Sequence, residues 1–186
     1  MKSFFGVVAT VFLTMTAGSA EVRPGKEGNL AEFLPPKPGE RVCFARSYDA
    51  AHLAKHPKQT VASIKFALAY HRHEPDKYRK DGQRNYYFKL EVRQRSRPNK
   101  TLSVVGDCFP GDGVIHCGVE CDGGGIQVKW RDQPKTILID LAATGRIRLD
   151  NCGGEENSVE LTPGADDRTF LLTRISDAAC PIYDKW

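Results

Sequence analysis

Residues 61–70 read VASIKFALAY and residues 86–97 read YYFKLEVRQRSR, and both stretches alternate with a period of two. In the first, large apolar side chains stand at the even positions from 64 to 70. In the second, apolar residues stand at positions 86, 88, 90 and 92, and charged residues at the odd positions from 89 to 97. A helix would spread these charges around its axis, whereas a strand places them on one face. We therefore predict two long strands, each with one buried face.

Further strands and short turns continue this pattern along the chain. The turns are rich in Gly, Asp, Asn and Pro, and short loops of this kind favour antiparallel neighbours. Asp49–Lys55 is predicted to be one short helix, with Asp49 as its cap and His56-Pro57 as its end. The additional strands are predicted at Val42–Tyr48, Thr101–Val105, Val114–Cys121, Ile126–Trp130, Thr136–Leu141, Arg146–Leu149, Val159–Thr162 and Phe170–Ile175.

This order of elements predicts an all-β fold, an antiparallel meander that closes into a β-barrel or folds into a sandwich. The sequential connections favour the barrel. The architecture resembles that of the calycins, small secreted barrels that bind apolar ligands, and that of the periplasmic β-barrel inhibitors of lysozyme. No motif of either family matches a run of residues here, so the resemblance implies an architecture and no function.

Residues 1–20 have the features of a secretory signal peptide. Lys2 is followed by an apolar core at Phe4–Met15 and by small residues at Ala17–Ala20, and this core is too short to span a bilayer. Residues 21–40 form a Pro/Gly-rich leader in which only 29–34 are expected to turn, with Asn29 as the cap. Residues 41–186 are predicted to be a single β domain without a transmembrane segment. We expect a periplasmic or secreted protein.

Six cysteines follow the predicted signal, and an even number in an oxidising compartment indicates disulfides. If Asp112-Gly113 is a hairpin turn, Cys108 faces Cys117 and these two form a bond. Cys43 and Cys180, near the two ends of the domain, are expected to pair, which leaves Cys121 for Cys152. A zinc site would need a second close pair beside Cys117 and Cys121, and the sequence has none.

Charge is unevenly distributed along the chain. Residues 41–100 hold 15 Lys and Arg against 5 Asp and Glu, whereas residues 101–186 hold 8 against 14. A basic binding face is predicted where four cations alternate along one strand, joined by Lys65 and His71 of the preceding strand. Its partner would be an anionic envelope component or an acidic protein. Nucleic acid is not expected, because no aromatic row interleaves the cations. The alternative is a solvated surface. The four cations are Lys89, Arg93, Arg95 and Arg97.

Metal and catalytic motifs are weak. His71 and His73 share one face of a strand, and His116 or Glu74 is the candidate third ligand, but no residue pattern fixes the set. His52 and His56 have helical spacing, yet Leu53 stands where a zinc protease needs glutamate. Asp140 in an apolar strand is a candidate acid for a glycosidase whose partner lies elsewhere.

These patterns leave two classes of function. The favoured class is a non-enzymatic binding or interaction protein of the periplasm or cell envelope, without a cofactor. The alternative is an envelope enzyme, a hydrolase with dispersed acids and histidines, or a weak metal-binding protein.

Overall fold

The computed structural model describes residues 21–149 and 159–180, and these residues are mostly strands. All ten predicted strands are present, with ends that differ by a few residues. The described strands are β1 (Arg41–Ser47), β2 (Val61–His73), β3 (Gln83–Gln94), β4 (Thr101–Pro110), β5 (Ile115–Gly118), β6 (Gly125–Asp132), β7 (Thr136–Asp140), β8 (Ile147–Arg148), β9 (Glu160–Leu161) and β10 (Thr169–Arg174). The helical elements of the same ranges are α1 (Leu30–Phe33), α2 (Ala50–Lys55) and the 3-10 turn η2 (Asp177–Ala179).

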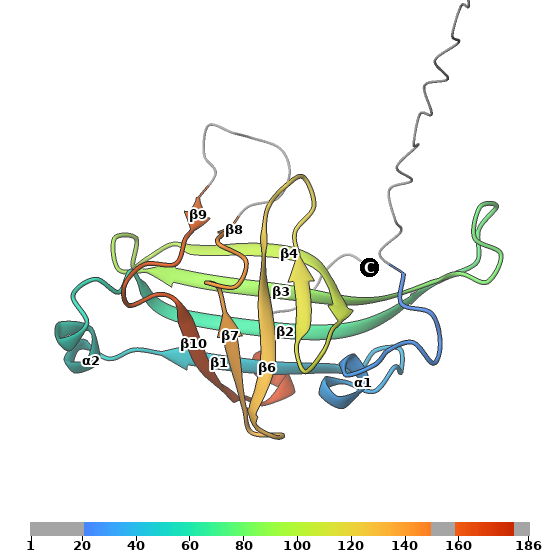
Figure 1. The fold of residues 1–186 in the computed structure, drawn as a ribbon, viewed down its shortest axis with the longest axis horizontal. Helices are drawn as coiled ribbons and strands as arrows, with labels where there is room; N and C mark the ends of the chain where they lie inside the picture. Colours follow the sequence, from blue (N-terminus) through green and yellow to red (C-terminus); the bar gives the residue numbers. More distant parts are fainter. Residues whose placement is uncertain (1–20, 150–158, 181–186) are drawn as a thin grey trace, which may run out of the picture.

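Eight of these strands close into a barrel in the order β1-β10-β7-β6-β5-β4-β3-β2. Every neighbouring pair is antiparallel, and because the strand order is closed, the barrel is confirmed over the sandwich. Strands β1, β2 and β3 run across the molecule, and β6, β7 and β10 cross them at a steep angle (Figure 1). The remaining pair, β8 and β9, forms a small separate sheet in the connection between β7 and β10.

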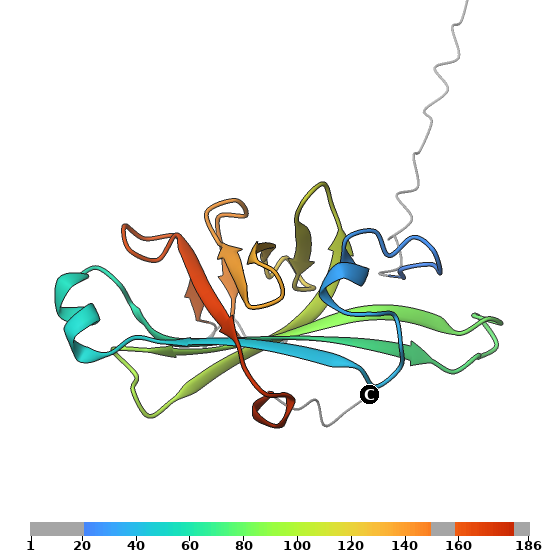
Figure 2. The ribbon, with the colours of Figure 1, turned by 90° about the horizontal axis from the view of Figure 1, so that it is seen from below.

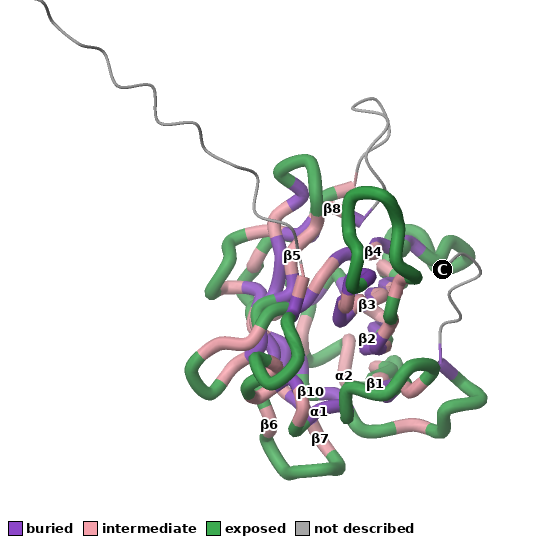
Figure 3. Tube along the Cα trace, turned by 90° about the vertical axis from the view of Figure 1, so that its right-hand side faces the viewer, coloured by how far each residue is buried: buried purple, intermediate pink, exposed green. Residues whose placement is uncertain are grey.

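The barrel interior is a packed core. The even positions of β2 and β3 face inward as the alternation predicted: Phe66, Leu68, Tyr86 and Phe88 are each 0% exposed. They belong to one cluster that also contains inward residues from each of the six remaining barrel strands. Buried positions follow the middle of the barrel, and exposed ones the loops (Figure 3). An eight-stranded barrel has an interior just wide enough for side chains to fill.

The predicted leader packs against this barrel. Val22, Leu30, Phe33 and Leu34 are buried in the same core cluster, and the Phe33 ring stacks on Trp130 with centroids 4.5 Å apart. The four-residue helix α1 thus adds apolar side chains to the core. The burial explains why a segment rich in proline and glycine has a defined place here.

Asn29 does not cap α1, contrary to the sequence prediction. Its backbone is already helical, and its side chain makes no capping bond. Its amide instead donates to the carbonyl of Val114 at 2.8 Å and accepts from the backbone N–H of Gly111 at 3.2 Å. Asn29 therefore fixes the loop between β4 and β5.

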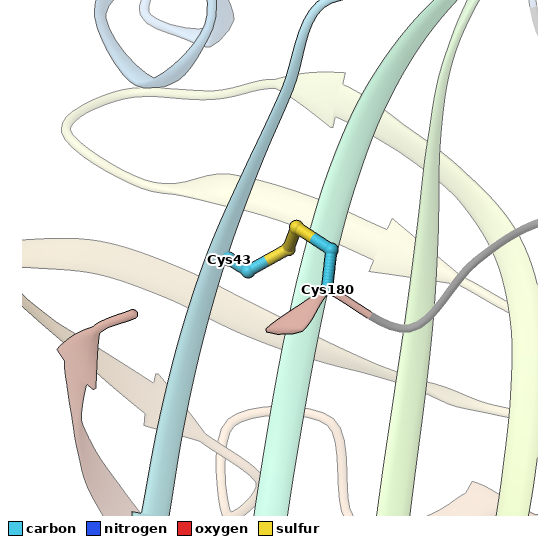
Figure 4. The surroundings of a disulfide bond; sticks show 2 residues. All are labelled: Cys43 and Cys180. Atoms are coloured by element: carbon cyan, nitrogen blue, oxygen red, sulfur yellow. A yellow bond between two sulfur atoms is a disulfide. The ribbon is translucent and has the colours of Figure 1, made fainter. Parts of the chain in front are cut away.

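Two disulfides join the predicted pairs of cysteines. Cys108 on β4 lies directly opposite Cys117 on β5, with Cα atoms 4.0 Å apart. The register agrees with the prediction, although residues 111–114 form a longer connection than a two-residue turn. Cys43 on β1 is bonded to Cys180, which follows η2, with Cα atoms 5.5 Å apart (Figure 4).

The second bond holds η2 and Cys180 on the outside of the barrel. In Figure 2, η2 lies on the face of β1, β2 and β3 that points away from the rest of the barrel. There Cys43, Ala67 and Cys180 form a small buried cluster against Ile175. The backbone N–H of Ile175 also donates to the carbonyl of Cys43 at 3.0 Å.

Some predictions fall outside the described residues. Cys121 is disulfide-bonded, but its predicted partner Cys152 lies in the range 150–158, so that pairing stays a prediction. The predicted signal peptide, residues 1–20, lies outside as well. Within 21–149 and 159–180, no helix is long and apolar enough to cross a membrane.

The buried phenol of Tyr86 predicts a loss of stability at alkaline pH. Its hydroxyl donates to the carbonyl of Leu34 at 3.1 Å, and burial, followed by the charges of Glu27 and Tyr70, raises its pKa above 10.0. A raised folded-state pKa stabilises the protein fully below the unfolded value, and this contribution is lost as pH rises through the folded value.

The free energy of unfolding, measured in urea between about pH 9 and pH 11, should therefore fall with pH, and less steeply in Tyr86→Phe. At neutral pH that variant should lose about 1 kcal/mol with its hydrogen bond. Tyr78→Phe is the matched control, because its side chain is 80% exposed. Equal slopes in wild type and Tyr86→Phe would contradict the assignment.

Candidate functional site

The four predicted cations do not form one row. β3 ends at Gln94, so Arg95 and Arg97 lie beyond the strand, and strand alternation does not place them on the same face as Lys89 and Arg93. On the strand itself, the Lys89 ammonium lies 3.4 Å from the carboxylate of Glu91 on the same face. Lys89 and Arg93 thus remain on the outer face of β3, with an acid between them.

Arg95 has a structural position. Its guanidinium Nη1 lies 3.3–3.5 Å from four backbone carbonyls at and after the end of α2. Its backbone N–H also donates to the carbonyl of Thr60 at 2.9 Å. A cation stabilises carbonyl groups left unpaired at a helix end. Arg95 therefore holds the segment that leads from α2 to β2. The four carbonyls belong to Leu53, His56, Pro57 and Gln59.

What remains of the predicted basic face is a small hollow across β2, β3 and β4. Lys65 and Arg93 are its cations, and Glu91 lies opposite Lys65 in the strand register. The hydroxyls of Ser63 and Thr101 flank Arg93 on the neighbouring strands. We call Ser63, Lys65, Arg93 and Thr101 the basic patch. The hollow has a volume of about 90 Å³, so it suits a group of a larger partner better than a whole ligand.

The predicted metal ligands are only partly brought together. The rings of His71 and His73 lie 4.5 Å apart on the outer face of β2, as the alternation predicted. His116 is on β5, with β3 and β4 between it and β2, and the described residues contain no group of three or more His, Cys, Asp or Glu side chains arranged to hold a metal. Here His73 bonds to the Tyr87 hydroxyl at 2.6 Å instead.

Burial shifts the pKa values of His71 and of two residues near His73, Tyr87 and Asp107. It raises the pKa of Tyr87 to about 12, and nearby Asp107 adds to that rise. Burial likewise raises the pKa of Asp107, opposed by a hydrogen bond from Asn85 at 3.0 Å. The pKa of His71 is lowered by burial first and by the charge of His73 second. All three shifts favour the neutral form, which suits packing more than a charged site.

Asp140 is a turn residue. Its side chain is on the outer face of β7, only partly buried, and it accepts a hydrogen bond from the backbone N–H of Ala143 at 3.1 Å. A short polar side chain that bonds to the backbone three residues on stabilises a turn. The burial that a glycosidase acid would need is therefore missing at this position.

A larger polar groove lies where β1 separates from β10. The two strands pair only at Phe44 and Ala45, and β1 then continues along β2 toward α2. The space beside β1 holds a groove of about 270 Å³. We call it the histidine groove. It is lined by Arg46, Tyr48, His52, His56, Gln59, Leu138, Asp166, Thr169 and Leu171.

Three rings and a guanidinium form a ladder along this groove. Arg46 lies 5.3 Å from the centroid of the Tyr48 ring, which is 4.7 Å from His52, and His52 stacks on His56 at 4.3 Å. The two histidines are adjacent because His52 is in α2 and His56, four residues on, is the residue that ends this helix and still donates its backbone N–H to the carbonyl of His52. Asp49 begins this helix by accepting from the backbone N–H of His52 at 2.7 Å, as predicted.

Polar contacts fix the ladder from behind. Gln59 is 4% exposed; its amide Nε2 donates to the carbonyl of Val61 at 2.8 Å and its Oε1 lies 3.0 Å from His52 Nε2. Since Oε1 can only accept, the network assigns the proton of this bond to His52 Nε2. Burial raises the pKa of Tyr48, and the charge of Arg46 opposes that rise. Tyr48 therefore keeps its phenolic proton at neutral pH.

The opposite wall comes from the segment that leads into β10. Asp166 Oδ1 lies 3.9 Å from His56 Nδ1, and Asp166 Oδ2 accepts from the backbone N–H of Lys58 at 3.2 Å. Leu138 and Leu171 face each other on the outer side of β7 and β10 and form an apolar patch. The groove thus combines a guanidinium, two imidazoles, one carboxylate and exposed leucine surface.

The sequence pattern gave a partial signal for this groove. The spacing of His52 and His56 correctly indicates that the two side chains are neighbours, and His56 ends the helix as predicted, but the sequence assigns the pair no function. Nothing in the sequence places Asp166 or Leu171 opposite α2, because more than a hundred residues separate them along the chain. Asp166 and Leu171 come to lie opposite α2 because the barrel closes between β1 and β10.

Fold and surface together define an antiparallel eight-stranded barrel with a packed interior, and among its described residues the basic patch and the histidine groove are polar hollows on the outside. The chain matches no protein-family model, no curated protein and no solved structure at a significant level.

Proposed function

We propose that this chain is an exported, non-enzymatic binding protein of the periplasm or cell envelope that takes an anionic partner on the outer surface of its barrel. The packed interior is the observation that carries this proposal. Inward positions of the barrel strands belong to one core cluster, and both polar hollows described above open on the outside. Disulfides persist in oxidising compartments, which supports export.

The basic patch is the proposed contact with the anionic partner. Lys65 and Arg93 stand on neighbouring strands of a rigid sheet, and Ser63 and Thr101 add hydroxyl donors. A guanidinium binds a carboxylate or phosphate through two parallel hydrogen bonds. The partner would be an acidic protein or an anionic polymer of the envelope.

A hydrolase is the alternative, because His56 and Asp166 face a groove together. A catalytic His–Asp pair is normally joined by a hydrogen bond and has a nucleophile within reach. Here the two side chains are 3.9 Å apart, and the lining hydroxyls are those of Tyr48 and Thr169. The raised pKa of Tyr48 makes its phenol a poor nucleophile. Binding is therefore the better-supported function.

Charge reversal of the patch tests the proposal. In Lys65→Glu/Arg93→Glu, capture of envelope components and binding of fluorescent poly-aspartate should fall at least about tenfold, because two attractive contacts become repulsive. Arg95 is left unchanged because it supports α2. Thermal unfolding should stay close to that of the wild type.

Lys129→Glu is the matched control, an exposed cation on β6 outside both hollows. It should bind like the wild type. Binding that survives the double reversal, or that depends equally on Lys129, would contradict a role for the basic patch.

A further inference from the structure

We infer that the histidine groove is a second, separate binding site, and that its ligand is a small carboxylate with an apolar body. The residues of this groove and those of the basic patch do not overlap. The inference therefore goes beyond the proposed contact with an anionic partner, and each can fail without the other.

Arg46 is the anchor for the carboxylate. Its guanidinium lies over the Tyr48 ring, and it has no ion pair with any acid of the described ranges. A guanidinium placed on a ring still directs N–H donors outward along its edge. These donors match the two oxygens of a carboxylate. An always-charged group at one end of the groove favours an anionic ligand.

Leu138 and Leu171 provide the contact for an apolar body. Leu171 is 45% exposed, one of three large apolar side chains in the described residues that are open to solvent. Its paired neighbour Leu138 lines the same groove. Exposed apolar surface beside a few fixed polar groups is typical of small-molecule sites. The volume of about 270 Å³ is just below the usual range, so the ligand is small.

The groove is organised before any ligand arrives. Gln59 orients His52, and the stacked rings restrict His56 and Tyr48. Asp167 holds the opposite wall of the groove, because it accepts hydrogen bonds from the backbone N–H and the hydroxyl of Thr60, each at 2.6 Å. A site whose side chains are already ordered loses less conformational entropy on binding. This order distinguishes the groove from an ordinary gap between surface loops.

Other ligand classes fit less well. A metal ion would need three or more suitable ligands, and the described residues offer no such group. An inorganic oxyanion would use Arg46 but leave Leu138 and Leu171 uncovered. A neutral apolar molecule would cover the leucines but leave the guanidinium without a partner. A carboxylate with an apolar body satisfies both ends.

The test uses the mature chain with its disulfides intact and four probes: phenylacetate, its neutral analogue phenylacetamide, acetate and inorganic phosphate. Calorimetry gives each affinity, and NMR shows which side chains respond. Phenylacetate should bind and shift the resonances of Leu171 and His52. The other three probes should bind about ten- to hundredfold more weakly, because each lacks one of the two contacts.

Two variants separate the contacts. Arg46→Gln should weaken phenylacetate binding about ten- to hundredfold and leave phenylacetamide binding unchanged, since only the charged contact is lost. Leu171→Asn should weaken both aromatic probes. Arg174→Gln, an exposed position on β10 outside the groove, is the control and should bind like the wild type.

Several outcomes would overturn the inference. They are no response of the groove resonances to phenylacetate, phosphate binding as tight as that of phenylacetate, or wild-type affinity for phenylacetate in Arg46→Gln. Thermal unfolding of each variant verifies that it is folded. Lys65→Glu/Arg93→Glu should keep its affinity for phenylacetate, which distinguishes failure at one site from failure at the other.

Discussion

Replacing Cys43 and Cys180 together with alanine is expected to lower the free energy of unfolding by about 5 kcal/mol. The bond joins residues 137 positions apart, so its loss releases most of the chain in the unfolded state. Loop-closure entropy grows with the logarithm of loop length, which places this bond near the upper end of the usual range. Alanine is chosen because both sites are buried among apolar groups.

The Cys108→Ala/Cys117→Ala double variant is the matched comparison. This bond closes a separation of only 9 residues between strands that are already paired, so its loss should cost about 3 kcal/mol. Denaturant unfolding under oxidising conditions measures both variants. A larger loss from the short loop than from the long one would show that strain or local packing dominates over chain entropy.

Most of the fold could be predicted because the period-two signal is local. Strands β2 and β3 alternate so regularly that their buried and exposed faces follow directly from the residue types, and Phe66 and Phe88 are buried as expected. The opposition of Cys108 and Cys117 followed from simple counting around a turn. Strand ends were less predictable: β3 stops at Gln94, although the charge alternation continues to Arg97.

The candidate sites were less predictable, because they depend on contacts between distant segments. Arg95 looks like the next cation of a regular row, yet the carbonyls that surround it belong to a segment about 40 residues earlier. Asn29 has the residue type of a helix cap, but a loop more than 80 residues away provides its partners. The local sequence pattern correctly identifies polar side chains, but it does not indicate which residues they will be hydrogen-bonded to in the fold.

The adjacent acids Asp166 and Asp167 show the same limit most clearly, because the sequence treats them alike. Asp166 lines the histidine groove, whereas Asp167 is 1% exposed. The buried carboxylate accepts from the backbone N–H and the hydroxyl of Thr60, and from the backbone N–H of Val61 at 3.4 Å. It thereby ties the segment before β10 to the start of β2.

Asp167→Ala should therefore lower the free energy of unfolding by about 3 kcal/mol, because buried donors would lose a charged acceptor. Asp167→Asn, which keeps one acceptor oxygen, should lose less. Asp166→Ala is the neighbouring control; it removes one hydrogen bond, from the backbone N–H of Lys58, and the 3.9 Å contact with His56, both at partly exposed groups, and should cost under about 1 kcal/mol.

Phenylacetate affinity provides a second measurement on the same variants. Because Asp167 holds the groove wall that contains Thr169 and Leu171, Asp167→Ala should also weaken phenylacetate binding under conditions where the variant is fully folded. Asp166→Ala should keep the binding contributed by Arg46 and the leucines. If both alanine variants proved equally stable, or if Asp167→Ala bound phenylacetate as the wild type does, Asp167 would not be the residue that holds this wall in place.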